Sequence, residues 1–315
     1  MLKIGTRGSQ LALWQANHIA SRLRELHPGL DITLDIIKTS GDRIQDRALS
    51  EVGGKGLFVK EIEEALLEGR IDLAVHSMKD VPGQLPEGLT LAAMPRRASP
   101  HDALITFSGL KLAELPAGAR VGTGSLRRRF QLLRIRPDLD VVGVRGNVDT
   151  RLQKLDDRAG GLSGIILAVS GLERLGLGGK ITEVLQAPEF LPAIGQGALG
   201  LETREDDARV RALLEPLRDR TTEVCVLAER GVLARLEGDC HLPIACHTSL
   251  SDDGELTIHA RLGLPDGSRM IEATITGPSE DPTLTGLRLG DSLLDGGGRA
   301  LMASIEAHVD AAPTL

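Results

Sequence analysis

Arginines gather at two places where an apolar, strand-like segment is followed by a helix-like one. The first is segment 122–129, GTGSLRRR, and the second is segment 144–147, VRGN, with Arg151 one helical turn further on. Glycine lets the backbone approach a ligand, Thr123 and Ser125 offer hydroxyl groups, and the free amides of a helix N-terminus carry partial positive charge. The third glycine of GxGxxG is missing, so this is not that nucleotide-binding motif. Alone, GTGSLRRR also fits a capped helix with a solvated basic face, but two such corners together predict an anion-binding site.

Two further cations and a carboxylate follow other predicted strands. Lys79 lies in the segment AVHSMKDVP and Arg7 lies in GTRGS. Because guanidinium groups bind carboxylates through two hydrogen bonds and stay charged at physiological pH, the whole set predicts a ligand with several carboxylates. Asp80 could exchange a proton or stabilise a developing cation, although its position before Pro82 also fits a simple turn. His76 is predicted to be a hydrogen-bonded strand histidine rather than a base.

Two cysteines and two histidines lie close together in the segments DCH, 239–241, and CH, 246–247. A zinc site is one alternative. The spacing between these cysteines does not match the usual CxxC pattern, and no second cysteine pair lies elsewhere, which argues against structural zinc. Cys225 and Cys246 are predicted to be buried, unreactive thiols. Cys240, in a predicted loop, is a candidate for a covalent tether through its thiolate.

The first hundred residues alternate short apolar strands with helices. This βαβ alternation predicts a mostly parallel sheet with helices on both faces. Such sheets bind ligands beyond the carboxyl ends of their strands, so the loops that follow the strands are the places where a site is expected. The predicted elements are strands at 2–6, 32–37 and 71–75, a helix capped by Ser9 and a helix at 57–67 that Gly69 ends.

Two more segments follow with different patterns. A second α/β segment runs from about residue 100 to 192, and from residue 221 the pattern changes to α+β, which predicts a separate third domain. The predicted strands of the second segment are 103–106, 120–122, 141–144 and 164–169. The third segment is predicted to contain a helix at 221–237, strands at 256–262 and 270–276 and a last helix at 301–309.

Composition limits the remaining classes of function. The chain has 315 residues, 41% apolar and 26% charged, which predicts a globular protein of more than one domain. With 2% aromatic residues and a net charge of −7, it offers few stacking platforms and little average attraction for nucleic acid. No export signal is visible, and the longest apolar stretch is too short to span a membrane. We therefore expect a cytoplasmic protein with reduced cysteines and no nucleic-acid or membrane partner.

Six segments follow one another in the order known from one enzyme family. They are GGKGLFVKEIE, AVHSMKDVP, GTGSLRRR, VRGNVDTRL, PAIGQGA and EGDCHLPIA. Through them the chain resembles the porphobilinogen deaminase family over almost its whole length. The resemblance implies two periplasmic-binding-protein-like α/β domains around a cleft and a smaller α+β C-terminal domain with an antiparallel sheet. The expected domains are a discontinuous domain 1 (1–98 and 197–217), domain 2 (99–196) and domain 3 (218–315).

The resemblance also implies an activity and a cofactor. Members of this family join four porphobilinogen molecules head to tail on a covalently bound dipyrromethane primer, lose ammonia at each addition, and release hydroxymethylbilane by hydrolysis. Cys240 would hold the primer through a thioether. Asp80 would be the catalytic acid that helps the amine leave and stabilises the azafulvene cation. The resemblance implies a monomer, and no metal site is expected. The resemblance implies further functional residues, which bind cofactor or substrate, lie in the segment over the site or lie near the interdomain hinge. They are Arg7, Ser9, Lys55, Phe58, Lys79, Thr123, Ser125, Arg127, Arg128, Arg145, Arg151 and Gln196.

A few residues depart from the family pattern. Asp239 stands where glycine is usual and puts a negative charge beside the tether thiol, Glu51 stands where some relatives have lysine, and His241 and His247 are unfamiliar. Three alternatives stay open at this point. They are a non-catalytic solute-binding type of protein for a polycarboxylate ligand, a metal-organised scaffold around residues 240–247, and a deaminase-like chain without activity.

Overall fold

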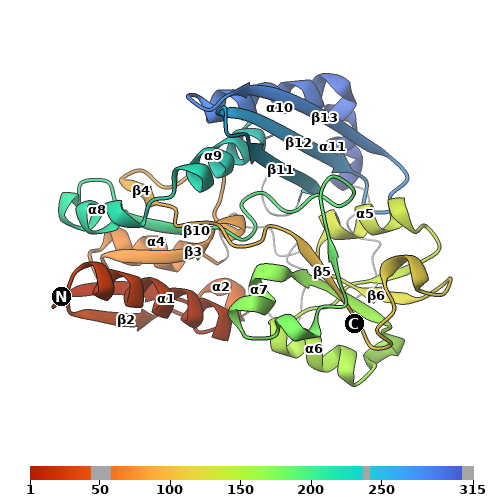
Figure 1. The fold of residues 1–315 in the computed structure, drawn as a ribbon, viewed down its shortest axis with the longest axis horizontal. Helices are drawn as coiled ribbons and strands as arrows, with labels where there is room; N and C mark the ends of the chain where they lie inside the picture. The colour runs from red at the N-terminus through yellow and green to blue at the C-terminus, as the bar shows by residue number, and fades with distance from the viewer. Residues whose placement is uncertain (44–57, 237–241, 307–315) are drawn as a thin grey trace.

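The computed structural model describes residues 1–43, 58–236 and 242–306. Figure 1 shows three lobes, each built around its own sheet, with the N-terminal lobe at the left and the C-terminal sheet at the top. In the described residues, the first two lobes each contain a five-stranded sheet and the third contains a three-stranded sheet. None of the helices described is both long enough and apolar enough to cross a membrane.

The first lobe is a sheet with strand order β2-β1-β3-β10-β4. β1 runs parallel to β2 and β3, whereas β10 runs antiparallel to both β3 and β4. The chain therefore returns to this sheet after it has built the second lobe. The strands are Leu2–Thr6 (β1), Ile32–Ile36 (β2), Leu73–Ser77 (β3), Leu89–Ala93 (β4) and Leu199–Arg204 (β10), and the helices are Gln10–Leu26 (α1), Ser40–Arg43 (α2), Lys60–Leu67 (α4) and Ala208–Leu214 (α8).

Local sequence explains where the first helices begin and end. The Ser9 side chain caps α1 by accepting a hydrogen bond from the Ala12 amide at 3.3 Å. Buried positions then recur every three or four residues along α1, at Ala16, Ile19, Ala20 and Leu23. Gly69 has φ of 69°, a left-handed conformation that glycine adopts without strain, and it follows the end of α4.

The second lobe has strand order β7-β6-β8-β5-β9. β6 runs parallel to β7 and β8, and β5 runs antiparallel to β8 and β9. Its two apolar clusters lie on opposite faces of the sheet, because Leu104 and Ile105, which are adjacent on β5, belong to different clusters. The strands are Asp102–Thr106 (β5), Arg120–Gly122 (β6), Asp140–Val142 (β7), Gly164–Ala168 (β8) and Glu183–Leu185 (β9), and the helices are Leu126–Ile135 (α5), Val148–Asp156 (α6) and Val169–Arg174 (α7).

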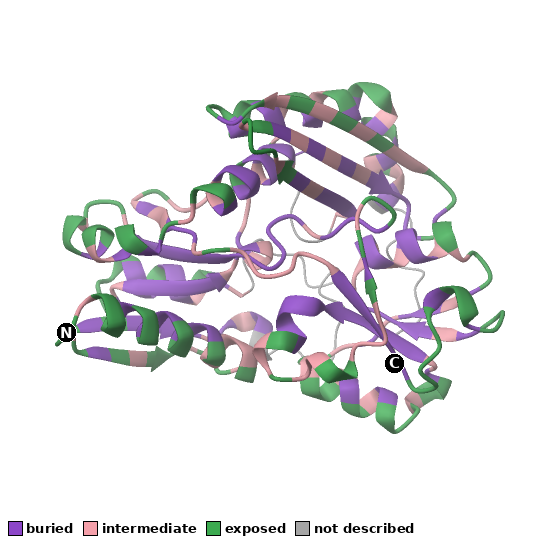
Figure 2. Cartoon of the chain, viewed as in Figure 1, coloured by how far each residue is buried: buried purple, intermediate pink, exposed green. Residues whose placement is uncertain are grey.

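The third lobe is an antiparallel sheet with order β11-β12-β13. Along β12 the residues Leu256, Ile258, Ala260 and Leu262 are buried, and Figure 2 shows this alternation of burial. The strands are Ile244–Leu250 (β11), Glu255–Gly263 (β12) and Met270–Pro278 (β13), and the helices are Arg220–Arg235 (α9), Pro282–Leu293 (α10) and Arg299–Glu306 (α11). Short 3₁₀ turns lie at Met78–Asp80, Leu112–Glu114, Ala159–Gly161, Gly178–Lys180 and Glu215–Leu217, and a π-helical turn lies at Leu294–Gly298.

The predicted order of an α/β, a second α/β and an α+β lobe is confirmed, but the prediction of a mostly parallel sheet is wrong. Each of the first two sheets is mixed, because β10 and β5 enter antiparallel to their neighbours. Both strands arrive from the other lobe rather than through a βαβ crossover, so the connection that enforces parallel pairing is absent. β10 and α8 lie with the first lobe, whereas the domain boundaries at 98, 197 and 217 stay predictions.

Candidate active site

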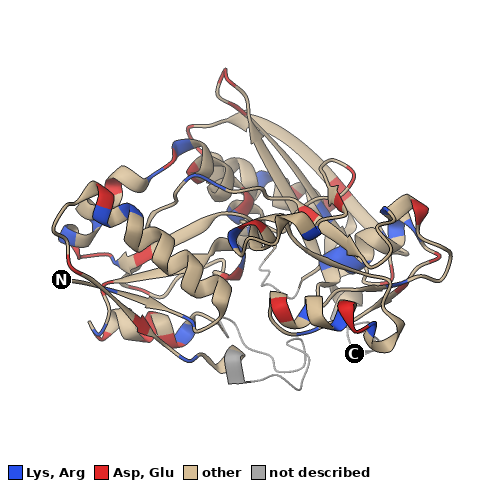
Figure 3. Cartoon of the chain, turned by 60° about the horizontal axis from the view of Figure 1, so that its bottom comes forward, with Lys and Arg blue, Asp and Glu red and all other residues tan. Residues whose placement is uncertain are grey.

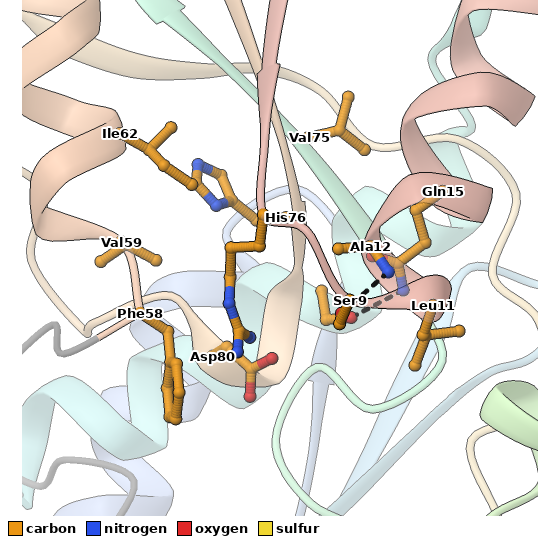
Figure 4. Close-up of a pocket in the computed structure, with 12 residues that line it drawn as sticks. Ser9, Leu11, Ala12, Gln15, Phe58, Val59, Ile62, Val75, His76 and Asp80 are labelled. Carbon is orange, nitrogen blue, oxygen red and sulfur yellow. Dashed lines mark hydrogen bonds between the residues drawn. The ribbon is translucent and has the colours of Figure 1, made fainter. Parts of the chain in front are cut away.

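A pocket in the first lobe contains Asp80, and we call it the Asp80 pocket. Asp80 ends the 3₁₀ turn that follows β3, and Figure 4 shows it between Phe58 and Ser9. The Gln15 amide donates a hydrogen bond to the Ser77 hydroxyl at 2.8 Å, which joins α1 to the end of β3. Three elements therefore meet at Asp80: the β1–α1 corner, the start of α4, and β3. The lining residues are Arg7, Ser9, Leu11, Ala12, Gln15, Phe58, Val59, Ile62, Val75, His76, Ser77 and Asp80.

Arg7 and Phe58 contact each other within this pocket. The Arg7 guanidinium carbon lies 4.2 Å from the centre of the Phe58 ring, which is a cation–π contact. The structure thus brings together four of the residues predicted for the site, namely Arg7, Ser9, Phe58 and Asp80. Among the described residues, no hydrogen bond or ion pair engages the Asp80 carboxylate.

The N-terminus of α5 has the capped geometry predicted from GTGSLRRR. The Ser125 hydroxyl accepts a hydrogen bond from the Arg128 amide at 3.4 Å, and the Thr123 hydroxyl accepts one from the Ser125 amide at 3.2 Å. Both hydroxyls therefore order the corner between β6 and α5. The cap leaves the partial positive charge of the helix end beside Arg127 and Arg128.

The side chains of Arg127 and Arg128 bind Asp102, a residue that the sequence analysis did not single out. Arg127 donates to Asp102 Oδ2 at 2.7 Å, and Arg128 donates to Oδ1 through Nε at 2.9 Å and Nη2 at 2.7 Å. Arg127 is 4% exposed, Arg128 6% and Asp102 0%. Burial alone would raise the pKa of Asp102, but the two guanidinium groups hold it well below its usual range.

Gln196 joins this ion-pair group from the segment that leads back to the first lobe. Its amide donates to the Pro100 carbonyl at 2.7 Å and to Asp102 Oδ1 at 3.0 Å. Pro100 and Gln196 belong to the two chain segments that connect the α/β lobes, one in each direction. This contact joins the two connecting segments to each other.

Lys79, Arg127, Arg128 and Arg151 form a group that we call the basic cluster. Burial, together with Arg128 and Arg127 and against the opposing effect of Asp80, lowers the pKa of Lys79 to about 8. Burial and then Arg128 lower the pKa of Arg151 to about 10. The Lys79 ammonium of the first lobe therefore interacts electrostatically with the arginines of the second lobe. Figure 3 shows basic positions in both α/β lobes where they approach each other.

Within the part of the chain that the structure describes, the four cations of the basic cluster face two carboxylates, Asp80 and Asp102. Asp102 is one carboxylate for two arginines, and among the described residues the Arg151 guanidinium donates only to the Gly146 carbonyl, at 2.7 Å. Among the described residues, Lys79 and Arg145 make no hydrogen bond or ion pair. Mutual repulsion in a desolvated place disfavours this excess of cations unless an anion binds there.

Several predicted residues cannot be placed, because Lys55 and Cys240 lie outside the described residues, as do Glu51, Asp239 and His241. The predicted burial of Cys225 and Cys246 is confirmed. Burial raises the pKa of Cys225 to about 11 and the pKa of Cys246 well above its ordinary value, which makes both thiols unreactive. His247 stacks on His101, with ring centres 5.9 Å apart.

Comparison with protein families identifies the chain. Residues 2–212 match the porphobilinogen deaminase dipyrromethane cofactor-binding domain, and residues 223–295 match the porphobilinogen deaminase C-terminal domain. A solved nutrient-binding protein from Burkholderia cenocepacia bound to methionine is 12% identical, covers 68% of this chain and 90% of its own, and has a TM-score of 0.42. That likeness is too weak to indicate a ligand.

Curated relatives agree with the family match over nearly the full length. The porphobilinogen deaminase of Syntrophotalea carbinolica is 50% identical over 97% of this chain and 96% of its own. That of Nitratidesulfovibrio vulgaris strain DP4 is 52% identical over 97% of each chain, and that of Roseiflexus sp. is 51% identical over 96% and 98%. This chain is thus a transferase that uses a dipyrromethane cofactor, and it belongs to the porphobilinogen deaminase family.

Proposed function

We propose that Asp80 is the catalytic residue of this porphobilinogen deaminase. The observation that carries the proposal is its position: it is the carboxylate of a pocket that Arg7 and Phe58 also line, next to Lys79 of the basic cluster. No hydrogen bond or ion pair with another described residue engages its oxygens, so they can receive a proton or face a cation. These are the two tasks that loss of an amine from porphobilinogen requires.

The chemistry follows from the substrate. When the aminomethyl carbon–nitrogen bond breaks, the electron pair leaves with ammonia and a cation remains on the pyrrole. A carboxylate beside that cation stabilises it, and in a pocket with little water the effect is stronger than in bulk solvent. A new carbon–carbon bond then forms to the free ring carbon of the growing chain, whose carbon–hydrogen bond breaks. Asp80 is placed to accept that proton.

The residues of the basic cluster fit the cofactor. Dipyrromethane carries four carboxylates, and when bound it supplies a fixed primer with a free ring carbon for the first addition. Arg127, Arg128 and Arg151 would hold cofactor or substrate carboxylates, because their charge exceeds what Asp102 neutralises. Asp102 keeps the two arginines in place until a carboxylate arrives. Cys240 would hold the primer through its sulfur.

The other predicted residues take supporting roles in this proposal. Ser9, Thr123 and Ser125 order the two strand-to-helix corners, and Arg7, Lys79 and Arg145 offer positive charge to substrate carboxylates. Phe58 lines the pocket and Gln196 links the segments between the lobes, whereas Lys55, which lies outside the described residues, would act with Phe58 only as the family resemblance implies. We propose a cytoplasmic monomer without a nucleic-acid partner. The family match does not favour the alternative of a non-catalytic solute-binding protein.

Asp80→Asn tests the proposal. The variant should fold and carry the primer, yet its turnover should fall about 10²- to 10⁴-fold, the range for loss of a general acid or base. Asp35→Asn is the matched control, because Asp35 lies exposed on β2 of the same lobe. Primer loading is measured by intact mass and turnover by ammonia release. A loaded Asp80→Asn enzyme that works at the wild-type rate would show that another group performs the catalysis.

A further inference from the structure

Asp80 lies in a short stretch of chain, residues 78–83, that we call the Asp80 segment. Within it, the Val81 amide donates to the Met78 carbonyl at 3.2 Å and closes the 3₁₀ turn. The Met78 amide donates to the Ala198 carbonyl at 3.0 Å, which joins the turn to the chain that enters β10. Because so short a turn has few internal hydrogen bonds, the position of Asp80 depends on what packs against the segment.

Helix α9 of the third lobe packs against the Asp80 segment. Met78, Val81 and Val226 belong to one cluster of buried apolar residues, and Val226 lies within α9. Residues 229 and 230 follow Val226 by three and four positions, which places the three side chains on one face of the helix. Figure 1 shows α9 between the first lobe and the C-terminal sheet. One face of α9 is therefore directed at the segment that contains Asp80.

Arg230 donates hydrogen bonds to three consecutive carbonyl groups of the Asp80 segment. Its guanidinium donates to the Pro82 carbonyl at 2.8 Å, to the Gly83 carbonyl at 3.1 Å and to the Val81 carbonyl at 3.4 Å. A guanidinium group has five N–H donors in a rigid planar arrangement, so it can bind three carbonyls only while they keep their relative positions. Arg230 thus fixes the chain immediately after Asp80.

The partners of Arg230 are backbone groups rather than a counter-ion. In the part of the chain that the structure describes, Arg230 forms no ion pair with a carboxylate. Burial lowers the pKa of Arg230 and Glu202 opposes that shift, but Glu202 is itself bonded to His76, whose Nε2 lies 2.7 Å from Glu202 Oε2. The predicted hydrogen-bonded strand histidine is thereby confirmed. The charged guanidinium is left to form charge-assisted hydrogen bonds with the Asp80 segment, and these are stronger than bonds between neutral groups.

Glu229, the neighbour of Arg230 on α9, supports the other end of the Asp80 segment through Gly195. The Gly195 amide donates to Glu229 Oε2 at 2.7 Å, and Glu229 is fully buried. Gly195 packs so closely on the turn that a Cβ atom in its place would lie 2.8 Å from Met78 Cβ. The Asp80 segment is therefore held by Gly195 at its start and by Arg230 at its end, and both contacts lead to α9.

We propose that Arg230 is a positioning residue for the Asp80 carboxylate. The proposal rests on Asp80 being the catalytic residue. α9 ends at Arg235, and Cys240, the predicted tether of the primer, follows five residues later in the sequence. One helix thus supports the Asp80 segment and leads toward the cysteine that would hold the growing chain. A misplacement of about 1 Å at a catalytic group can cost about 100-fold in rate, so the contact between Arg230 and the segment bears directly on turnover.

Turnover of Arg230→Gln, measured by ammonia release, tests the positioning role. The variant should carry the primer, as measured by intact mass, and its kcat should fall about 10- to 100-fold. Its KM should change about twofold or less, because the basic cluster keeps its charges. A kcat that stays at the wild-type value in a loaded Arg230→Gln enzyme would overturn the proposal.

Arg204→Gln is the matched control. Arg204 also donates to two backbone carbonyls of the first lobe, those of Leu66 at 2.9 Å and Ile71 at 2.8 Å. It lies at the end of β10 that is remote from the Asp80 segment, because Leu199, at the other end of β10, pairs with Ser77. The kcat of Arg204→Gln should stay close to that of the wild type, and equal losses in the two variants would overturn the proposal.

A double-mutant cycle separates positioning from a general structural role. In Asp80→Asn the carboxylate is already gone, so adding Arg230→Gln should lower the residual turnover by about twofold or less. A structural role would lower turnover by the same factor in both backgrounds, and that result would overturn the proposal. Wild-type turnover of Asp80→Asn alone would instead refute the catalytic role of Asp80, so the two claims fail separately.

A second variant keeps the proposal testable if Arg230→Gln fails to fold. Arg230→Lys keeps the positive charge, but an ammonium group lacks the planar arrangement of donors that binds the three carbonyls together. Its kcat should fall about three- to tenfold, with no comparable loss in the Asp80→Asn background. A wild-type kcat in Arg230→Lys would show that the hydrogen bonds to the three carbonyls do not position Asp80.

Discussion

Asp102 should contribute far more to the free energy of unfolding than an exposed aspartate in a similar ion pair. Its fully buried carboxylate accepts hydrogen bonds from Arg127, Arg128 and Gln196 at 2.7 to 3.0 Å. Replacing it by alanine leaves two buried guanidinium groups without their counter-charge. Removal of one partner from a buried ion pair costs about 3–5 kcal/mol. For a protein of this size, that corresponds to a fall in Tm of about 5–8 °C.

The measurement is thermal unfolding followed by circular dichroism, with Asp140→Ala as control. Asp140 pairs with Arg120 at 2.7 Å in the same lobe, but the two side chains are 42% and 40% exposed. Exposed pairs contribute about 0–1 kcal/mol, so this variant should unfold within a few degrees of the wild type. The reasoning about burial would be refuted if Asp102→Ala and Asp140→Ala lowered Tm by the same small amount.

Three further predictions follow from pKa shifts. The pKa of Lys79 is lowered to about 8, so Lys79 loses its positive charge between about pH 7.5 and pH 9 and the wild-type KM should rise over this range. Lys79→Arg stays charged and should show a constant KM. Equal KM profiles in the two proteins would contradict the role of Lys79. The pKa of Glu63 is raised from 4.5 to about 7, so its stabilising contribution is complete below pH 4.5 and lost as pH rises through about 7. At 1.36 kcal/mol per unit the shift is worth at most about 3.4 kcal/mol, and partial solvation reduces it to about 1–2 kcal/mol. Urea unfolding should show that the free energy of unfolding of Glu63→Gln, relative to that of the wild type, increases by this amount between about pH 5 and pH 8.5. Burial raises the pKa of Cys225 to about 11 and that of Cys246 well above its ordinary value, so iodoacetamide at about pH 8 should modify neither thiol before denaturation. Labelling of either thiol in the native protein would contradict their burial.

Local patterns were sufficient to predict the elements that hold the site. The strand 2–6, the cap at Ser9 and the strand-to-helix corner at Ser125 depend on neighbouring residues alone, and the structure has all three. β10, in contrast, contains Gly200 and follows β3 by more than a hundred residues, so its partners are visible only in the fold. The mixed sheets depend on such long-range pairings, and no periodicity reports them.

The candidate site could also be predicted from local sequence only in part. Arg7, Phe58 and Asp80 meet in one pocket because each follows or precedes an element whose place the pattern predicts. Asp102 was missed because its type and spacing resemble those of many surface aspartates in this chain. Only the packing of β5 against α5 brings it between Arg127 and Arg128.

The intact mass of the purified, denatured protein, followed by peptide mapping, tests the central claim most directly. The account predicts additional mass equal to one dipyrromethane, located on the peptide that contains Cys240, and no additional mass in a Cys240→Ser variant. A folded wild-type protein with the mass of the bare polypeptide, still unmodified after incubation with porphobilinogen, would contradict the claim that this chain builds hydroxymethylbilane on a covalent primer.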